Sequence, residues 1–292
     1  MSSRFLTVSG RANIRLLTLL AFTIGITLRL NKQQHVLVLT SNTASVEIRG
    51  VDPASCFAPR DNILHFLEHE YLSGPFINVG FPKMGSTSLH NYFCCGNYTS
   101  SHWECGKGKG LCADCMKSAV LSGSPPLESC GDFQSFMQMD RDTFFPQIEL
   151  LNEMHIESPN ATLLLMFRNV SDWYRSLSYW KAGNATNHNS AEIHGKTLAE
   201  RLTDANISGL PPGKGVNETE MSQFFCNHVN NIRRFVAKHP SHALIELDIA
   251  SPSNALQLES LIGISRSCWG ESNKNPELHA STSDRVPNVC LR

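Results

Sequence analysis

The sequence lacks an excess of charge of either sign, because its 25 Lys and Arg residues nearly balance 26 Asp and Glu residues, for a net charge of −1. A balanced charge provides no general attraction for the phosphates of nucleic acids, so we expect no nucleic-acid partner. Internal repeats and long low-complexity segments are also missing. A chain of 292 residues is then most simply one domain of about 230–250 residues with an N-terminal extension.

The N-terminal region lacks an apolar run of the about 20 residues that a membrane-spanning helix needs. Its uncharged, mostly apolar stretch covers only residues 16–28, which suits the apolar part of a cleaved signal peptide. With Arg15 and Arg29 extending to the membrane surfaces, residues 14–30 make a marginal signal anchor, and the preceding positive charges favour a cytoplasmic N-terminus. We predict a cytoplasmic segment over 1–13, a membrane anchor over 14–30 and a stem over 31–60. A cleaved signal giving a secreted form, or a soluble protein, is the alternative.

Cysteine is plentiful, with ten residues of which six lie between Cys94 and Cys130. An even number clustered in a Gly-rich stretch with few helix signals indicates a disulfide-linked insertion, over residues 94–132, in an oxidising lumen. Asn-x-Ser/Thr sequences, including one at Asn169, agree with secretion and predict a glycoprotein. The alternative for the cluster is a zinc site, although only one closely spaced pair is present. That site would use Cys105, Cys112, Cys115 and Cys130.

A strand–turn–helix signal covers residues 76–89. An apolar run enters a Gly/Pro turn, after which Ser86, Thr87 and Ser88 begin a helical segment. The first turn of a helix leaves backbone N–H groups without partners in the helix, and the helix dipole favours negative charge there. This pattern predicts an anion-binding loop.

The same loop resembles a Walker A phosphate loop in the spacing from Gly80 to Gly85, yet differs from it at one position. Ser86 stands where the Walker loop has its Lys, and the Lys is found earlier, at Lys83. Losing the Walker Lys removes a main contact to the β- and γ-phosphates of a nucleoside triphosphate. The loop therefore favours another phosphate-containing ligand.

A second motif begins with the continuous apolar run at residues 162–167, which is typical of a buried parallel strand. Arg168 follows directly, and Ser176 lies eight residues further on, in a helix that Ser171 or Asp172 can cap. Arg offers a planar pair of donors for a phosphate, and Ser adds a hydroxyl donor. Both residue types are therefore suited to contacting a phosphate.

The two motifs together resemble the membrane-bound, carbohydrate-type branch of the sulfotransferases, which use 3′-phosphoadenosine 5′-phosphosulfate (PAPS). The resemblance covers about residues 76–89 and 160–180, and Val170 departs from it where the family usually has Pro. It implies PAPS as the sulfuryl donor. We expect no metal, because a sulfuryl group carries less charge than a phosphoryl group and needs less neutralisation. The resemblance also implies that the 5′-phosphosulfate is held by Lys83, Gly85, Ser86, Thr87 and Ser88, and the 3′-phosphate by Arg168 and Ser176.

Sulfuryl transfer also needs a base that takes the proton of the acceptor. The base is typically Glu in the membrane-bound branch and His in the cytosolic branch of the family. Glu104, 21 residues after Lys83, is the first candidate, and the adjacent His102 is the second. Further candidates are Asp132, Asp140 and His155.

Helix and strand signals alternate through the rest of the chain. We predict strands at 162–167 and 243–247, and helices at 144–156, 222–238 and 254–262. This order predicts an α/β fold with a central parallel sheet flanked by helices, and the resemblance implies a P-loop-like, three-layer form of it over residues 61–292. Cys268 and Cys290 are expected to tether an otherwise irregular tail.

The functional prediction is transfer of a sulfuryl group to a hydroxyl or amine, on a glycan or glycoprotein acceptor in the Golgi lumen. The choice of a carbohydrate rests on analogy with single-pass lumenal members of the family. Two alternatives remain open. One is a non-catalytic, disulfide-rich secretory binding protein on the same fold, and the other is a P-loop nucleotide kinase.

Overall fold

The computed structural model describes residues 56–60, 71–106, 108–179, 198–204, 217–270 and 289–290. These residues lie within one compact unit, residues 52–292. The predicted cytoplasmic segment, membrane anchor and most of the stem fall outside the described ranges. Among the described helices, none has the length and apolar character needed to cross a bilayer.

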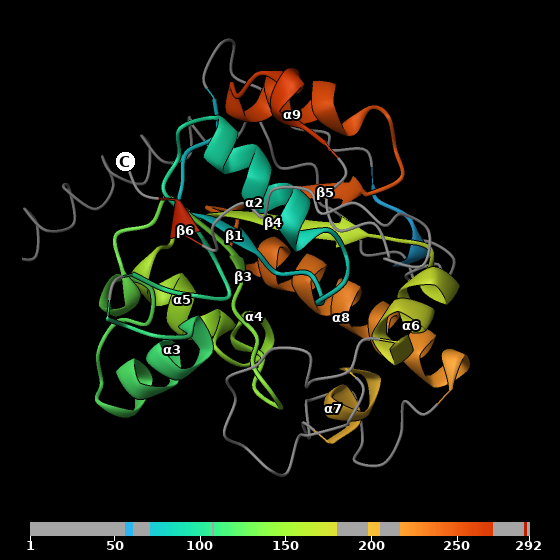
Figure 1. Cartoon of the computed structure of the whole chain (residues 1–292), viewed down its shortest axis with the longest axis horizontal. Coiled ribbons are helices and arrows are strands. Elements are labelled where there is room, and N and C mark those ends of the chain that lie inside the picture. Colours follow the sequence, from blue (N-terminus) through green and yellow to red (C-terminus); the bar gives the residue numbers. More distant parts are fainter. Residues whose placement is uncertain are drawn as a thin grey trace, which may run out of the picture. The chain divides into compact units, whose positions relative to one another are not determined.

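A central sheet has its strands in the order β5–β4–β1–β3–β2–β6 (Figure 1). The first five strands in that order are parallel, and β6 joins the edge of β2 in the antiparallel direction. Helices flank the sheet, so the predicted α/β fold with a parallel sheet is confirmed. The strands are β1 (Phe76–Asn78), β2 (Ser100–His102), β3 (Ser135–Gln138), β4 (Thr162–Phe167), β5 (Ala243–Asp248) and β6 (Val289–Cys290).

β4 lies between β1 and β5 and is the most apolar of the strands. All six residues of β4 are buried, as expected for a parallel strand that is covered on both faces. β4 pairs with β1 through Asn78 and Leu164, and with β5 along its whole length. The strand predicted at 162–167 is confirmed, and the strand predicted at 243–247 extends by one residue.

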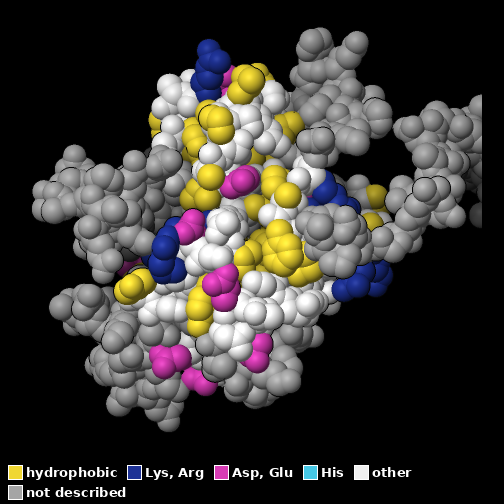
Figure 2. Space-filling model, turned by 90° about the vertical axis from the view of Figure 1, so that its right-hand side faces the viewer, with side chains coloured by type: hydrophobic (Ala, Val, Ile, Leu, Met, Phe, Trp, Pro, Cys, Tyr) yellow, Lys and Arg dark blue, Asp and Glu magenta, His cyan; other side chains and the backbone are white. Residues whose placement is uncertain are grey.

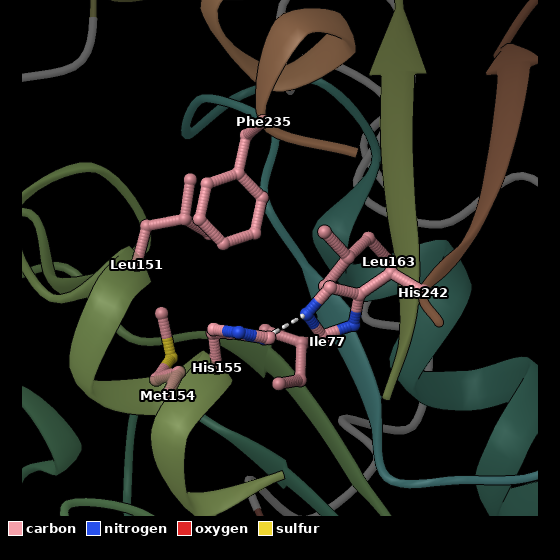
Figure 3. Close-up of a pocket in the computed structure, with 7 residues that line it drawn as sticks. All are labelled: Ile77, Leu151, Met154, His155, Leu163, Phe235 and His242. Atoms are coloured by element: carbon pink, nitrogen blue, oxygen red, sulfur yellow. Dashed lines mark hydrogen bonds between the residues drawn. The ribbon is translucent and has the colours of Figure 1, made fainter. Parts of the chain in front are cut away.

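Helices form a layer on each side of the sheet (Figure 1). α2 and α9 lie on one side, and α5 and α8 lie on the other. On the α5 and α8 side, Ile77 and Leu163 of the sheet line one pocket together with Leu151, Met154 and Phe235 of the helices (Figure 3). The helices are α2 (Ser86–Cys95), α3 (Cys112–Leu121), α4 (Pro146–Glu149), α5 (Leu151–Glu157), α6 (Val170–Tyr179), α7 (Leu198–Asp204), α8 (Glu218–Lys238) and α9 (Asn254–Ile262), with short 3-10 turns at Glu128–Cys130 and Arg266–Cys268.

Helix ends follow their capping residues more closely than the apolar pattern. α8 begins four residues before the predicted start because the Asn217 side chain accepts a hydrogen bond from the N–H of Glu220. α9 has the predicted bounds and ends at Gly263, whose φ of 82° suits glycine. The helix predicted at 144–156 is instead two helices, because Leu150 leaves helical geometry (φ −111°, ψ 21°) between α4 and α5.

Five disulfides use all ten cysteines, so the predicted disulfide bonding is confirmed. Two of them are local, and these contain the four cysteines of the zinc alternative. A cysteine in a disulfide has no thiolate to offer a metal, so the structure favours the disulfide interpretation. The pairs are Cys56–Cys226, Cys94–Cys290, Cys95–Cys268, Cys105–Cys112 and Cys115–Cys130. The tethers predicted at Cys268 and Cys290 are thus confirmed.

The Cys-rich segment 94–132 is more regular than the prediction of few helices. It contains strand β2, which belongs to the parallel sheet, and the ten-residue helix α3. Cys112, Met116 and Ala119 bury one face of α3, and their i, i+4 and i+7 spacing is typical of an amphipathic helix. The part after β2 is the connection from β2 to its parallel neighbour β3 and includes α3.

A buried ion pair joins α8 to β5. Arg233 donates from Nε to Glu246 Oε1 at 2.7 Å and from Nη2 to Oε2 at 2.6 Å. The N–H of Arg60 also donates to Glu246 Oε2 at 2.7 Å. The Arg233 guanidinium lies over the ring of Phe167, the last residue of β4. These contacts fix the end of β4, from which Arg168 continues.

Candidate functional site

The two predicted phosphate motifs meet at one edge of the sheet. They follow β1 and β4, which are neighbouring parallel strands, so the segments after both strands leave the sheet at its carboxyl edge. The chain then turns in opposite directions, since β1 is followed by β2 on one side and β4 by β5 on the other. Such a switch point in an open α/β sheet is the usual place for a ligand crevice.

Buried hydrogen bonds hold the loop between β1 and α2. The Trp173 indole Nε1 donates to Pro82 O at 3.0 Å, and the Arg168 Nη1 donates to Lys83 O at 2.9 Å. Burial lowers the pKa of His228 to about 4, so this ring is neutral and its Nε2 donates to Val79 O at 2.7 Å. Groups from α6, α8 and the second motif thus fix the carbonyls of the first motif.

Backbone conformation brings the loop sharply into α2. Lys83 has φ 68° and Gly85 has φ 100°, both in the left-handed region. A Cβ on Gly85 would lie 2.6 Å from Cδ1 of Ile249 and 3.2 Å from Cε of Met166, so these side-chain ends would have to shift, and the positive φ itself favours glycine. α2 then starts at Ser86, and its first-turn N–H groups face the end of the sheet.

The second motif supplies a cation and a hydroxyl next to this loop. Arg168 is half-buried and contacts the loop through the carbonyl of Lys83. Ser176, on α6, is 2% exposed, and its Oγ has no hydrogen-bond partner among the described residues. A buried hydroxyl without a partner is unusual in a folded protein. Its donor therefore suits a ligand that binds beside α6.

Two cations are concentrated at this point. Burial, together with the neighbouring Arg168 guanidinium, lowers the pKa of Lys83, and the Asp140 carboxylate opposes that shift. Burial likewise lowers the pKa of Arg168. Both shifts mean that the protein environment disfavours the positive charges as they stand. A bound anion would relieve this cost.

The two leading base candidates occupy different surroundings. His102 ends β2, and its Nε2 lies 3.3 Å from Ser86 Oγ and 3.2 Å from Thr87 Oγ1. Glu104 is exposed, and its backbone forms isolated bridges to His102 and Leu111. The structure therefore brings His102 against the hydroxyls of the loop, whereas the Glu104 side chain is exposed to solvent.

Two other base candidates lie at the opposite edge of the sheet. Asp132 is exposed and precedes the start of β3. His155 bonds to His242, which in turn bonds to Ala161 O just before β4, and Figure 3 shows both rings among apolar side chains. The amino ends of the strands are remote from the phosphate motifs, so neither residue belongs to this site.

Asp140 is the one further candidate that lies at the site. It follows the end of β3 by two residues and is 5% exposed. Gln138 and Gln147 hydrogen-bond to its carboxyl, and Arg201 of α7 lies close enough to act on its charge. An acidic residue two positions after a short strand is the sequence signal for this position, but nothing local identifies Arg201 as its neighbour.

No protein-family model matches this sequence, and no curated protein matches it. On the face shown in Figure 2, Lys and Arg side chains lie among acidic and apolar ones rather than in one basic area.

Proposed function

We propose that this chain transfers a sulfuryl group from PAPS to a hydroxyl or amine of a glycan or glycoprotein acceptor. The proposal rests on one observation above all. A Lys-containing loop at a helix N-terminus and an Arg–Ser pair follow two neighbouring parallel strands at a switch point of the sheet. On this proposal the fold is P-loop-like, with Lys83 in place of the Walker Lys.

Each end of the donor has groups that fit it. The first-turn N–H groups of α2 and the hydroxyls of Ser86, Thr87 and Ser88 suit the 5′-phosphosulfate. Arg168 and Ser176 suit the 3′-phosphate, and the buried, partnerless hydroxyl of Ser176 would gain an acceptor on binding. When bound, PAPS supplies the sulfuryl group. Lys83 then stabilises the negative charge that develops on the bridging oxygen as the bond to sulfur breaks.

The proposed setting is the Golgi lumen, with the N-terminal segment as a type II membrane anchor. The five disulfides support an oxidising compartment. The acceptor class rests on the resemblance alone. A nucleotide kinase is the weaker proposal because Ser86 occupies the position of the Walker Lys.

A thermal-shift titration tests the nucleotide site. The purified chain is titrated with 3′,5′-ADP, ATP and 5′-AMP without metal. A ligand that binds only the folded state stabilises it by about 2.7 kcal/mol at 100 times its Kd, so we expect 3′,5′-ADP alone to raise Tm. Stabilisation by ATP would support the kinase, and no stabilisation would support a non-catalytic binding protein.

Transfer is then measured with ³⁵S-labelled PAPS and a panel of chondroitin, desulfated heparin and N-acetyllactosamine. The Lys83→Ala variant should lose transfer of label while keeping its Tm, because the ammonium acts on the leaving oxygen. Lys109→Ala is the matched control, since that Lys is exposed in the Cys-rich segment. Wild-type turnover by Lys83→Ala would refute the assignment of the loop.

A further inference from the structure

Asp140 lies where the proposed donor and an acceptor would meet. β3 pairs with β1 on the side opposite to β4, so the segment after β3 leaves the same edge of the sheet as the Lys83 loop. The Asp140 carboxylate is near enough to Lys83 to raise its pKa against the effect of burial. The loop therefore has Arg168 on one side and Asp140 on the other.

Two glutamines connect Asp140 to the phosphate loop. Both Gln138 and Gln147 hydrogen-bond to the Asp140 carboxyl. The Ser86 hydroxyl also donates to Gln138 Oε1 at 3.2 Å, and Gln147 Nε2 donates to Gly80 O at 3.4 Å. The carboxylate is thus oriented by the same side chains that contact both ends of the loop.

The other two base candidates at this edge are less suited to removing a proton. Glu104 is exposed to solvent, and the His102 Nε2 is occupied by the hydroxyls of Ser86 and Thr87. Asp140 is a buried carboxylate beside the Lys that faces the reacting group, and the function proposed above gives it no role.

We propose that Asp140 is the general base that accepts the proton of the acceptor hydroxyl or amine, an inference that rests on the proposed sulfuryl transfer. As the acceptor oxygen forms its bond to sulfur, its proton passes to a carboxylate oxygen of Asp140. The bond between sulfur and the bridging oxygen breaks, and its electron pair leaves on the 5′-phosphate of 3′,5′-ADP. The products are the sulfated acceptor, 3′,5′-ADP and protonated Asp140.

The electrostatic surroundings suit this role. Burial raises the pKa of Asp140 to about 6, and the Arg201 guanidinium and the hydrogen bonds of Gln138 and Gln147 limit the rise. The charged groups around it are Lys83 from the β1 loop, Arg201 from α7 and Asp142, which pairs with Arg201 at 3.6 Å. A base whose pKa lies just below neutral is ionised at working pH yet can take a proton in the transition state.

The test compares Asp140→Asn with Asp142→Asn in the full chain. Both variants remove one carboxylate beside Arg201, but only Asp140 is tied to the loop. Turnover is followed with ³⁵S-labelled PAPS and the acceptor of the panel that wild type labels best, or by release of labelled sulfate to water. We expect Asp140→Asn to lose about 10²- to 10⁴-fold in kcat. Its affinity for 3′,5′-ADP should stay within threefold of wild type, and Asp142→Asn should stay within threefold in kcat.

Two results would overturn the inference. One is an Asp140→Asn variant with near wild-type kcat. The other is a folded Asp140→Asn variant that loses 3′,5′-ADP affinity together with kcat, since Asp140 would then position Lys83 rather than accept a proton. Failure of wild type itself to bind 3′,5′-ADP would instead refute the proposed function.

The pH dependence of wild type gives a second test that needs no Asp140 variant. Because the base must be ionised, kcat should fall about tenfold per pH unit below an apparent pKa of about 6. The same acidic limb should persist in His102→Gln, whose imidazole could otherwise cause it. A rate that is flat between about pH 5 and 7, or a limb that disappears in His102→Gln, would refute Asp140 as the base.

Discussion

Replacing Gly85 with Ala tests whether the phosphate loop depends on close packing at the start of α2. Gly85 has φ 100°, and an added Cβ would lie 2.6 Å from Ile249 Cδ1. Gly123, after α3, provides a control because it has φ 72° and nothing lies within 4 Å of an added Cβ. Gly123→Ala therefore introduces the backbone strain without the steric conflict.

The expected magnitudes differ for the two variants. A side chain in the left-handed region costs about 1–2 kcal/mol, which both variants share. Forcing an extra methyl into a packed site costs about 1–3 kcal/mol more, and only Gly85→Ala should show it. The free energy of unfolding should thus fall by about 2–5 kcal/mol in Gly85→Ala and by about 1–2 kcal/mol in Gly123→Ala.

Urea unfolding gives the stabilities, and calorimetric titration with 3′,5′-ADP gives the affinities. Relief of the conflict has to move Ile249, Met166 or the start of α2, so we expect Gly85→Ala to bind 3′,5′-ADP at least about tenfold more weakly. Gly123→Ala should bind as wild type does. Equal losses of stability in the two variants, with unchanged affinity in both, would refute the account of the loop.

Three further predictions concern single side chains. Arg168→Ala should weaken 3′,5′-ADP binding by about 1.5–3 kcal/mol in calorimetric titration, the value of a hydrogen bond to a charged group. Replacing the exposed Arg175 of α6 with Ala should leave the affinity unchanged. Equal effects of the two substitutions would exclude Arg168 from the site. Glu246→Gln should lower the free energy of unfolding by about 3–5 kcal/mol because Arg233 stays buried without its charge partner. The same change at Glu259, which is in a surface ion pair, should lower it by at most about 1 kcal/mol. Similar losses for the two variants in urea unfolding would contradict the assigned role of the buried pair. The rise of the pKa of Asp140 from 3.8 to about 6 means that its ionised form opposes folding by about 3 kcal/mol. This residue therefore favours the folded state below about pH 4, and that contribution is lost as the pH rises through about 6. The stability of Asp140→Asn relative to wild type should increase between these two pH values, and a constant difference would contradict the pKa shift.

Local signals in the sequence are sufficient for much of the fold. The continuous apolar run of β4 and the Gly263 stop of α9 specify those elements almost to the residue, because burial on both faces and a left-handed cap each require particular residue types. The strand–turn–helix over residues 76–89 was predictable for the same reason. Its glycine and hydroxyl residues are adjacent in the chain, so no tertiary information was needed to place them together.

Properties that depend on strand order were not predictable. Asp140 is buried because β3 lies beside β1, and its neighbour Arg201 comes from a helix 61 residues away in the chain. Which of His102 and Glu104 lies against the hydroxyls of Ser86 and Thr87 also depends on where β2 ends relative to α2. The disulfide partners of Cys94 and Cys95 are equally distant in the sequence and could not be predicted. Helix α3, by contrast, could have been predicted from the helical spacing of Cys112, Met116 and Ala119.

The two adjacent cysteines at the end of α2 determine when this helix can be secured during synthesis. Their partners, Cys290 and Cys268, follow 196 and 173 residues later. At about 5–20 residues per second, a ribosome needs roughly 10–40 s to supply Cys290. The disulfides that close 7 and 15 residues can form long before that. The helix that follows the Lys83 loop is therefore fastened only by the late-synthesised Cys268 and Cys290. A nascent chain arrested before Cys268 would carry both cysteines of α2 as reactive thiols open to mispairing.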